Sequence, residues 1–191
     1  MYAEVRVPTG GQMRALGRRL AGLLRPGDLV VLTGPLGAGK TTLAQGIGDG
    51  LGVRGPVTSP TFVIARVHPS LRGGPALVHA DAYRLGSRAE VDDLDLDADL
   101  DSSVTVVEWG EGLVEDLSAS HLEVKIRLAP RTLPPAMAGL TRASSPDGAE
   151  VPDEPRIVQL TGTGKRWEAA ARSAGLGGSV WAEAQPGTAG G

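Results

Sequence analysis

Apolar positions along this chain fall into stretches with the period of a strand and stretches with the period of a helix. Residues 29–33 form a continuous apolar run, which is typical of a strand buried on both faces. Residues 121–128 alternate apolar and polar positions, as a strand with one wet face does. Further strands are expected at residues 4–7, 62–67, 76–80, 104–109 and 156–161.

Two segments between these runs have the pattern of amphipathic helices. Apolar residues recur at helical spacing from position 13 to position 23, and Thr9 with Gln12 forms a capping-box pair before them. In the second segment Leu43, Ile47 and Leu51 repeat every four residues. Strands that alternate with helices favour an α/β fold in which at least part of the sheet is parallel.

The length of 191 residues suits one ordinary domain. Hydrophobic residues make up 41% of the chain but aromatic residues only 3%, so the core must rest on aliphatic side chains. Two segments are rich in Gly, Pro and Ser and lack apolar periodicity: residues 131–155 are expected to be a flexible insertion and 174–191 a disordered tail. The predicted domain therefore comprises residues 1–130 and 156–173.

Charge and cysteine content exclude several classes of protein. The formal net charge is −3 and the pI near 5.6, so no global basic field draws the chain onto nucleic acid or an anionic membrane. The absence of cysteine excludes a disulfide scaffold, a thiolate metal site and a cysteine nucleophile. No apolar run approaches the roughly 20 residues of a membrane span, and the first residues do not resemble a signal peptide. A cytoplasmic protein without membrane association is expected.

Residues 34–41 read Gly-Pro-Leu-Gly-Ala-Gly-Lys-Thr and match the pattern G-x-x-x-x-G-K-[ST] of a phosphate-binding loop. A buried-strand run precedes the loop and an amphipathic helix follows it, which disfavours the alternative of a glycine-rich turn that matches by chance. Glycines let backbone N–H groups turn toward phosphate oxygens, Lys40 can reach the β- and γ-phosphates, and Thr41 is placed to bind Mg²⁺. We therefore expect a P-loop NTPase-like three-layer sandwich with a mostly parallel central sheet.

Two acidic residues, Asp81 and Glu108, close apolar strand runs and are candidates for the metal site. A P-loop enzyme needs an acidic residue at the end of a second buried strand to hold Mg²⁺ or its waters. Either residue alone could be a strand-terminal acid that faces solvent, and the sequence leaves open which of the two has which role. The acidic stretch 92–101 fails the EF-hand template and is expected to be a solvated loop.

The chain resembles the TsaE family (also called YjeE), small bacterial ATPases of tRNA threonylcarbamoyladenosine biosynthesis. Four motifs match in order, and they lie at residues 34–42, 58–62, 79–85 and 107–109. The resemblance covers residues 4–128 and a shorter piece around 156–166. Many families share a P-loop, whereas the ordered set of four motifs is specific.

The resemblance implies an ATPase that binds and hydrolyses Mg-ATP, slowly without its partners. The nucleotide-binding residues it implies are Gly34, Pro35, Leu36, Gly37, Ala38, Gly39, Lys40, Thr41, Thr42, Thr58, Thr61 and Trp109. The implied catalytic residues are Glu108, Lys40 and Asp81, and the implied Mg²⁺ ligands are Thr41, Asp81 and Glu108. The hydroxyls of Thr58, Ser59 and Thr61 would act as a nucleotide-sensing switch, whereas composition alone indicates an ordinary loop. Tyr83, Arg84 and Trp109 would lie near the nucleotide or a partner, although Trp109 could equally be a core aromatic and Arg84 a surface salt-bridge residue.

By the same resemblance, the partners are TsaD-like and TsaB-like proteins, and TsaD performs the threonylcarbamoyl transfer. ATP binding and hydrolysis by this chain would reset that complex between rounds. The tRNA would contact mainly the partners, so no strong direct nucleic-acid binding is expected. Two alternatives are a small-molecule kinase that uses the same loop and a non-catalytic nucleotide-sensing module.

Overall fold

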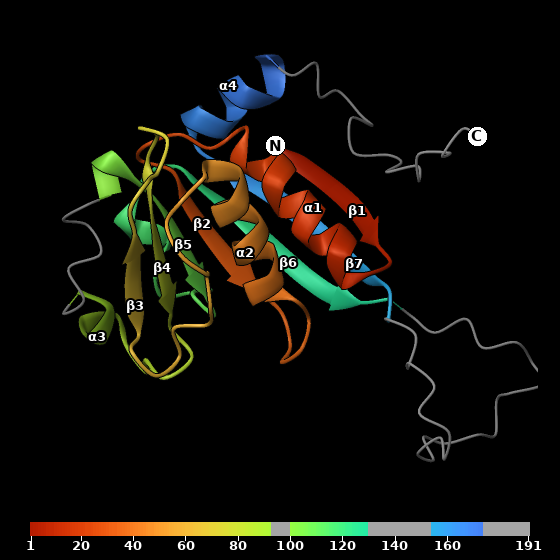
Figure 1. Ribbon diagram of the computed structural model, residues 1–191, viewed down its shortest axis with the longest axis horizontal. Helices are drawn as coiled ribbons and strands as arrows, with labels where there is room; N and C mark the ends of the chain where they lie inside the picture. The colour runs from red at the N-terminus through yellow and green to blue at the C-terminus, as the bar shows by residue number, and fades with distance from the viewer. Residues whose placement is uncertain (93–99, 130–153, 174–191) are drawn as a thin grey trace, which may run out of the picture.

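The computed structural model describes residues 1–92, 100–129 and 154–173, which form a sheet with helices packed on it (Figure 1). The strands are β1 (Tyr2–Val7), β2 (Leu29–Thr33), β3 (Ala65–His68), β4 (Ala76–Asp81), β5 (Ser103–Glu108), β6 (His121–Leu128) and β7 (Arg156–Thr163). The helices are α1 (Gly10–Ala21), α2 (Lys40–Leu51), α3 (Arg88–Asp92) and α4 (Lys165–Ser173), with 3-10 turns η1 (Leu100–Ser102) and η2 (Glu115–Leu117). The expected tail, nearly all of the expected insertion and most of the acidic stretch lie outside the described residues.

The sheet has seven strands in the order β1-β7-β6-β2-β5-β4-β3. The four central strands β6, β2, β5 and β4 are parallel, whereas β1 and β7, β7 and β6, and β4 and β3 pair in antiparallel fashion. The expected mostly parallel sheet is therefore corrected to a mixed sheet with a parallel centre. A short loop joins β3 to β4, and such a connection suits antiparallel neighbours because parallel strands need a longer crossover.

Alternate side chains of β2 supply two hydrophobic clusters, one on each face of the sheet. Val30 and Leu32 belong to the cluster that includes the apolar residues of α1 and α2. Leu29 and Val31 belong to the opposite cluster, which includes residues of α3 and of the segment around η2. The layers are thus unequal: two long helices cover one face (in front in Figure 1), and short elements cover the other.

The two long helices begin and pack as their sequences dictate. Thr9 caps α1, since its hydroxyl accepts the Gln12 N–H at 3.2 Å and Gln12 accepts the Thr9 N–H at 3.2 Å, which confirms the predicted capping box. Helices α1 and α2 cross at Gly17 and Gly46. A Cβ on Gly46 would lie 2.1 Å from the carbonyl oxygen of Arg14, so only glycine permits this close approach.

The strand expected at residues 62–67 is shorter and begins later, at Ala65. Residues before it form a turn, because the N–H groups of Val63 and Ile64 both donate to the carbonyl of Pro60, at 2.8 and 2.7 Å. Phe62 is 86% exposed on this turn, so its apolar character does not mark a buried strand.

Helix α4 is tied to the rest of the fold by an ion pair. The Arg166 guanidinium donates to both carboxylate oxygens of Asp28, at 3.0 and 2.9 Å, and to the carbonyl of Leu23 at 2.6 Å. The next residue, Trp167, is fully buried and joins the cluster beneath α1 and α2. Among the described residues, no helix combines the length and the apolar character that crossing a membrane demands.

Candidate nucleotide-binding site

The loop from Gly34 to Gly39 joins β2 to α2 at the edge of the sheet where the parallel strands end (lower edge in Figure 1). Gly34 and Gly39 have φ angles of 151° and 105°, which side-chain-bearing residues rarely adopt. A Cβ on Gly34 would also lie 2.4 Å from the carbonyl oxygen of Ile126. Helix α2 begins directly after the loop, so the unpaired N–H groups and the positive dipole end of this helix face it. This is an anion-binding geometry.

Lys40 folds back onto this loop. Its Nζ donates to the carbonyl oxygens of Gly34 and Pro35, at 2.8 and 3.1 Å, and lies 3.7 Å from the centre of the Trp109 ring. Burial lowers the pKa of Lys40 below its ordinary 10.5, and the nearby negative charges, chiefly that of Glu108, oppose this shift. An anion placed in the loop would stabilise the charged form of this ammonium.

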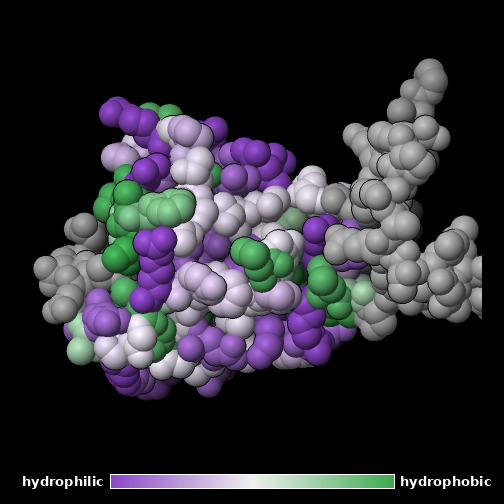
Figure 2. Space-filling model, turned by 90° about the horizontal axis from the view of Figure 1, so that it is seen from below, coloured by the Kyte–Doolittle hydropathy of each residue, from purple (hydrophilic) through white to green (hydrophobic). Residues whose placement is uncertain are grey.

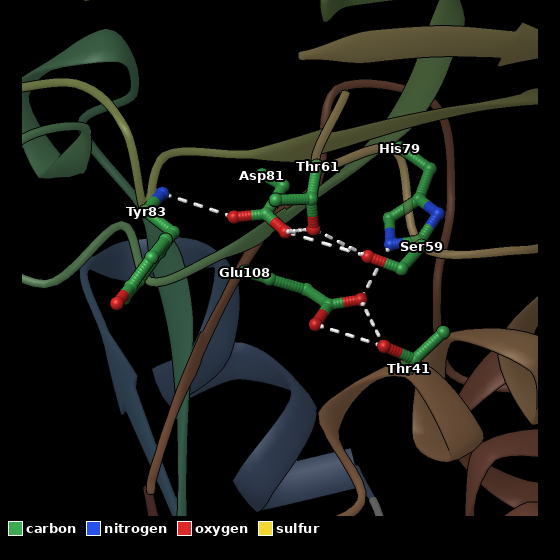
Figure 3. Close-up of polar contacts among 7 residues, drawn as sticks. All are labelled: Thr41, Ser59, Thr61, His79, Asp81, Tyr83 and Glu108. Atoms are coloured by element: carbon green, nitrogen blue, oxygen red, sulfur yellow. Dashed lines mark hydrogen bonds and ion pairs between the residues drawn. The ribbon is translucent and has the colours of Figure 1, made fainter. Parts of the chain in front are cut away.

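Glu108, at the end of β5, is buried, and its carboxylate accepts hydrogen bonds from two side chains (Figure 3). Thr41 Oγ1 lies 2.9 Å from Oε1 and 3.0 Å from Oε2 of Glu108. His79 Nε2 lies 2.9 Å from the same Oε1. In the described part of the chain, no three His, Cys, Asp or Glu side chains converge to hold a metal ion. The hydroxyl and carboxylate oxygens fit Mg²⁺, which usually takes one or two carboxylates and adds phosphate oxygens and waters.

Asp81 is paired in register with Glu108 on the neighbouring strand, but its carboxylate has different donors. The hydroxyl of Thr61 donates to Oδ2, that of Ser59 lies 3.5 Å from the same oxygen, and the N–H of Tyr83 donates to Oδ1 at 2.9 Å (Figure 3). The hydroxyls of Ser59 and Thr61 are 2.7 Å apart. Asp81 therefore faces the Ser59–Thr61 segment, whereas Glu108 faces the start of α2.

A cavity of about 250 Å³ opens between the glycine-rich loop and these two carboxylates. Its lining residues are Leu36, Gly37, Gly39, Lys40, Thr41, Thr42, Ser59, Thr61, Asp81, Glu108 and Trp109. All four residues that the sequence proposes for catalysis and for the metal thus lie around one cavity, although they come from three separate segments of the chain.

Four of the residues expected to bind nucleotide do not line this cavity. Gly34 and Pro35 contribute their carbonyls to Lys40, and Ala38 is fully buried within the loop. Thr58 lies elsewhere: its hydroxyl accepts from Arg66 at 3.4 Å, and it borders a separate cavity of about 400 Å³. The structure therefore does not bring Thr58 to the other hydroxyls of its motif.

Aromatic and apolar side chains surround the mouth of the cavity. Trp109 lies at the cavity with a φ of 61°, and its ring centre is 5.2 Å from that of Tyr83, so Trp109 is not a core aromatic. Arg84 lies over the ring of Phe62 at 5.1 Å. Leu36, Phe62 and Tyr83 are exposed, and Figure 2, which views this edge of the molecule, shows hydrophobic side chains among hydrophilic ones.

His79 is a site residue that sequence reasoning did not single out. It lies on β4 two positions before Asp81, so the alternation of the strand puts both side chains on the same face. That spacing is the signal that could have found it. Its link to Glu108 could not be found in this way, because the partner belongs to another strand.

The chain is similar to one protein family, to several of its members in sequence and to a solved structure. The family model described as "Threonylcarbamoyl adenosine biosynthesis protein TsaE" matches residues 7–132. A Streptomyces coelicolor protein named "tRNA threonylcarbamoyladenosine biosynthesis protein TsaE" is 57% identical over 159 residues, which are 83% of this chain and 95% of that protein. A Bacillus subtilis protein of the same name is 37% identical over 119 residues, 62% of this chain and 73% of that protein. The crystal structure of Bacillus subtilis YdiB is similar with a TM-score of 0.65 at 26% identity, over 92% of this chain and 95% of that one.

Proposed function

The chain belongs to the TsaE family of tRNA threonylcarbamoyladenosine biosynthesis, and on that basis we propose that it binds and hydrolyses Mg-ATP to support threonylcarbamoyl transfer to tRNA. The observation that carries this proposal is the convergence of Lys40, Thr41, Asp81 and Glu108 around one cavity at a helix N-terminus. Positioning and electrostatic stabilisation supply most of the catalysis in phosphoryl transfer, and these four side chains offer both.

The glycine-rich loop is assigned to the phosphates. Backbone N–H groups of the loop and the start of α2 would cradle phosphate oxygens. The Lys40 ammonium now shares its hydrogens between two neutral carbonyls of the loop. A phosphate oxygen is a stronger, charged acceptor, so this ammonium would exchange carbonyl partners for phosphate.

Thr41 and Glu108 are assigned to Mg²⁺, since their oxygens lie together at the start of α2. When bound, Mg²⁺ supplies charge neutralisation at the β- and γ-phosphates. Asp81, whose carboxylate accepts from the hydroxyls of Thr61 and Ser59, is assigned to the segment that senses the γ-phosphate and to orienting the attacking water. This division gives each carboxylate one role.

The proposed partners are TsaD-like and TsaB-like proteins, and the proposed location is the cytoplasm. Exposed apolar side chains at the mouth of the cavity, namely Leu36, Phe62 and Tyr83, support a protein partner that covers this edge. Turnover by the chain alone is expected to be slow, because an arginine supplied in trans can add about 10³–10⁵-fold in rate.

Phosphate release from Mg-ATP tests the proposal, measured for the chain alone and with both partners added. The wild type is expected to turn over slowly alone and faster with partners, and Lys40→Ala is expected to do neither. Bound nucleotide that is never hydrolysed, with or without partners, would contradict the ATPase proposal and favour a nucleotide sensor. A phosphorylated small molecule as the product would favour a kinase.

A further inference from the structure

Resting on the proposed function, we infer that His79 is a positioning residue that holds the Glu108 carboxylate ready for Mg²⁺. Its effect would be to set the Mg²⁺ concentration that tight nucleotide binding requires. His79 is not itself assigned to the metal, the nucleotide or the attacking water.

The contact between the two side chains is direct and buried. His79 Nε2 lies 2.9 Å from Oε1 of Glu108, and the two side chains are 0% and 4% exposed. A carboxylate oxygen only accepts, so the Nε2 nitrogen carries the hydrogen and donates it. Figure 3 shows the Glu108 carboxylate between His79 on one side and Thr41 on the other.

Burying the polar ring of His79 costs free energy, and the contact with Glu108 is what offsets this cost. Leu77, two positions earlier on the same face of β4, belongs to the hydrophobic cluster beneath α1 and α2, so an apolar side chain would suit this face. The second ring nitrogen of His79, Nδ1, is buried and has no hydrogen-bond partner within the described residues. Burying a polar ring with only half of its hydrogen bonds made is unfavourable, and the bond to Glu108 is the one that offsets this.

The bond to His79 also constrains Glu108 in a way that Thr41 does not. The hydroxyl of Thr41 contacts Glu108 but is itself an assigned Mg²⁺ ligand. His79 lies on β4, the strand paired with β5, and contacts the Glu108 carboxylate from this neighbouring strand. It therefore fixes the orientation of Glu108 independently of the metal. Groups that orient a metal-binding carboxylate typically change metal affinity by about 10–100-fold when removed.

His68 offers a matched control. It is buried on the adjacent strand β3, and its Nε2 also lacks a hydrogen-bond partner within the described residues. Its Nδ1 lies 3.3 Å from the carbonyl of Arg54, so its polar contact goes to the backbone and not to Glu108. Replacing His68 tests the loss of a buried imidazole from the neighbouring strand without touching the carboxylate.

The experiment is a fluorescence titration of the full chain with N-methylanthraniloyl-ADP, first in EDTA and then at increasing Mg²⁺. His79→Leu is expected to leave the nucleotide affinity in EDTA unchanged and to raise the half-maximal Mg²⁺ concentration about tenfold or more. His79→Gln is expected to recover most of the wild-type value, since its amide N–H can donate near the position of Nε2. His68→Leu is expected to behave as the wild type.

Equal Mg²⁺ midpoints for the wild type and His79→Leu would overturn the inference, and so would an equal shift in His68→Leu. If His79→Leu does not fold, His79→Gln and His79→Asn are compared instead. The amide of glutamine reaches the position of Nε2, whereas the shorter amide of asparagine reaches only the position of Nδ1. The Mg²⁺ midpoint is therefore expected to equal that of the wild type in His79→Gln and to be raised in His79→Asn. A wild type that binds the nucleotide without any response to Mg²⁺ would overturn the proposed function itself, which is a distinguishable outcome.

Discussion

Asp81 and Glu108 are paired in register at the ends of the neighbouring parallel strands β4 and β5, yet their carboxylates receive hydrogen bonds from different segments. Glu108 accepts from Thr41 at the start of α2, and Asp81 accepts from Thr61 in the loop before β3. The sequence does not distinguish the roles of these two acids, but in the structure their hydrogen-bond donors differ. One carboxylate is hydrogen-bonded to the start of α2, next to the glycine-rich loop, and the other to the proposed switch.

This division predicts different defects for two conservative substitutions. Glu108→Gln is expected to raise the half-maximal Mg²⁺ concentration for nucleotide binding by at least about tenfold, because it removes the charge of a proposed Mg²⁺ ligand. Asp81→Asn is expected to leave that midpoint within about twofold and to lower turnover by about 10²-fold or more, because it weakens orientation of the water. Parallel Mg²⁺ titrations and phosphate-release assays measure both. A larger Mg²⁺ shift for Asp81→Asn than for Glu108→Gln would reverse the assignment.

Lys40 and Trp109 predict an optical signal of nucleotide binding. The ammonium lies 3.7 Å from the indole ring centre. It is expected to move away from the ring when a phosphate oxygen accepts its hydrogen bonds. Tryptophan emission should therefore change on adding ADP, and the change should disappear in Trp109→Phe. A signal of the same size in Trp109→Phe would mean that the change arises at another tryptophan and that Lys40 stays where it is.

His68 predicts a loss of stability in mild acid. Burial, assisted by the neighbouring His79 and Arg66, lowers the pKa of His68 below its ordinary 6.5. The unfolded chain then binds the proton more readily than the folded chain, so the free energy of unfolding falls as pH drops below 6.5 toward the folded-state pKa. Above the ordinary value, this residue contributes no pH dependence.

Urea unfolding between about pH 8 and pH 5 measures this effect against His68→Gln, which cannot titrate there. The wild type is expected to lose more stability over the range than the variant. Curves that fall in parallel would show that other groups cause the whole pH dependence.

The Arg166–Asp28 ion pair predicts that the stability of the fold depends strongly on the anchoring of α4. Asp28 is 2% exposed, so Arg166→Ala leaves a buried carboxylate without its cation, and such a loss costs about 3–5 kcal/mol. Arg14 forms a similar pair with Asp49 at 2.6 Å, but both side chains are in contact with water. Arg14→Ala is therefore the control, with a much smaller expected loss in the free energy of unfolding. Equal losses would show that α4 is not anchored by this pair.

Local signals account for what the sequence predicts well. The capping box at Thr9, the alternation of residues 121–128 and the glycine-rich loop are each written in a few adjacent residues, and the structure has the corresponding helix start, strand and loop there. The strand predicted at residues 62–67 is wrong at its beginning, since β3 starts only at Ala65. Phe62 and its neighbours are apolar without being buried in the sheet.

Features that depend on pairing between distant segments could not be predicted. The direction of neighbouring strands is not encoded in the pattern of any one of them, so the antiparallel pairings of β7 and β3 were missed. The bond between His79 and Glu108 joins residues 29 positions apart on two strands, and only the parallel register of those strands brings them together.

The number of tRNA molecules that acquire threonylcarbamoyladenosine is the most direct measure of what ATP hydrolysis at this cavity does. The reaction would contain TsaD-like and TsaB-like partners, an activated threonylcarbamoyl donor, Mg-ATP, and either the wild-type chain or Lys40→Ala. With the wild type, each transfer complex is expected to modify many tRNA molecules, whereas Lys40→Ala, or a non-hydrolysable ATP analogue with the wild type, is expected to end the reaction after about one round. Equal numbers of rounds in all three reactions would contradict a role for ATP hydrolysis at this cavity.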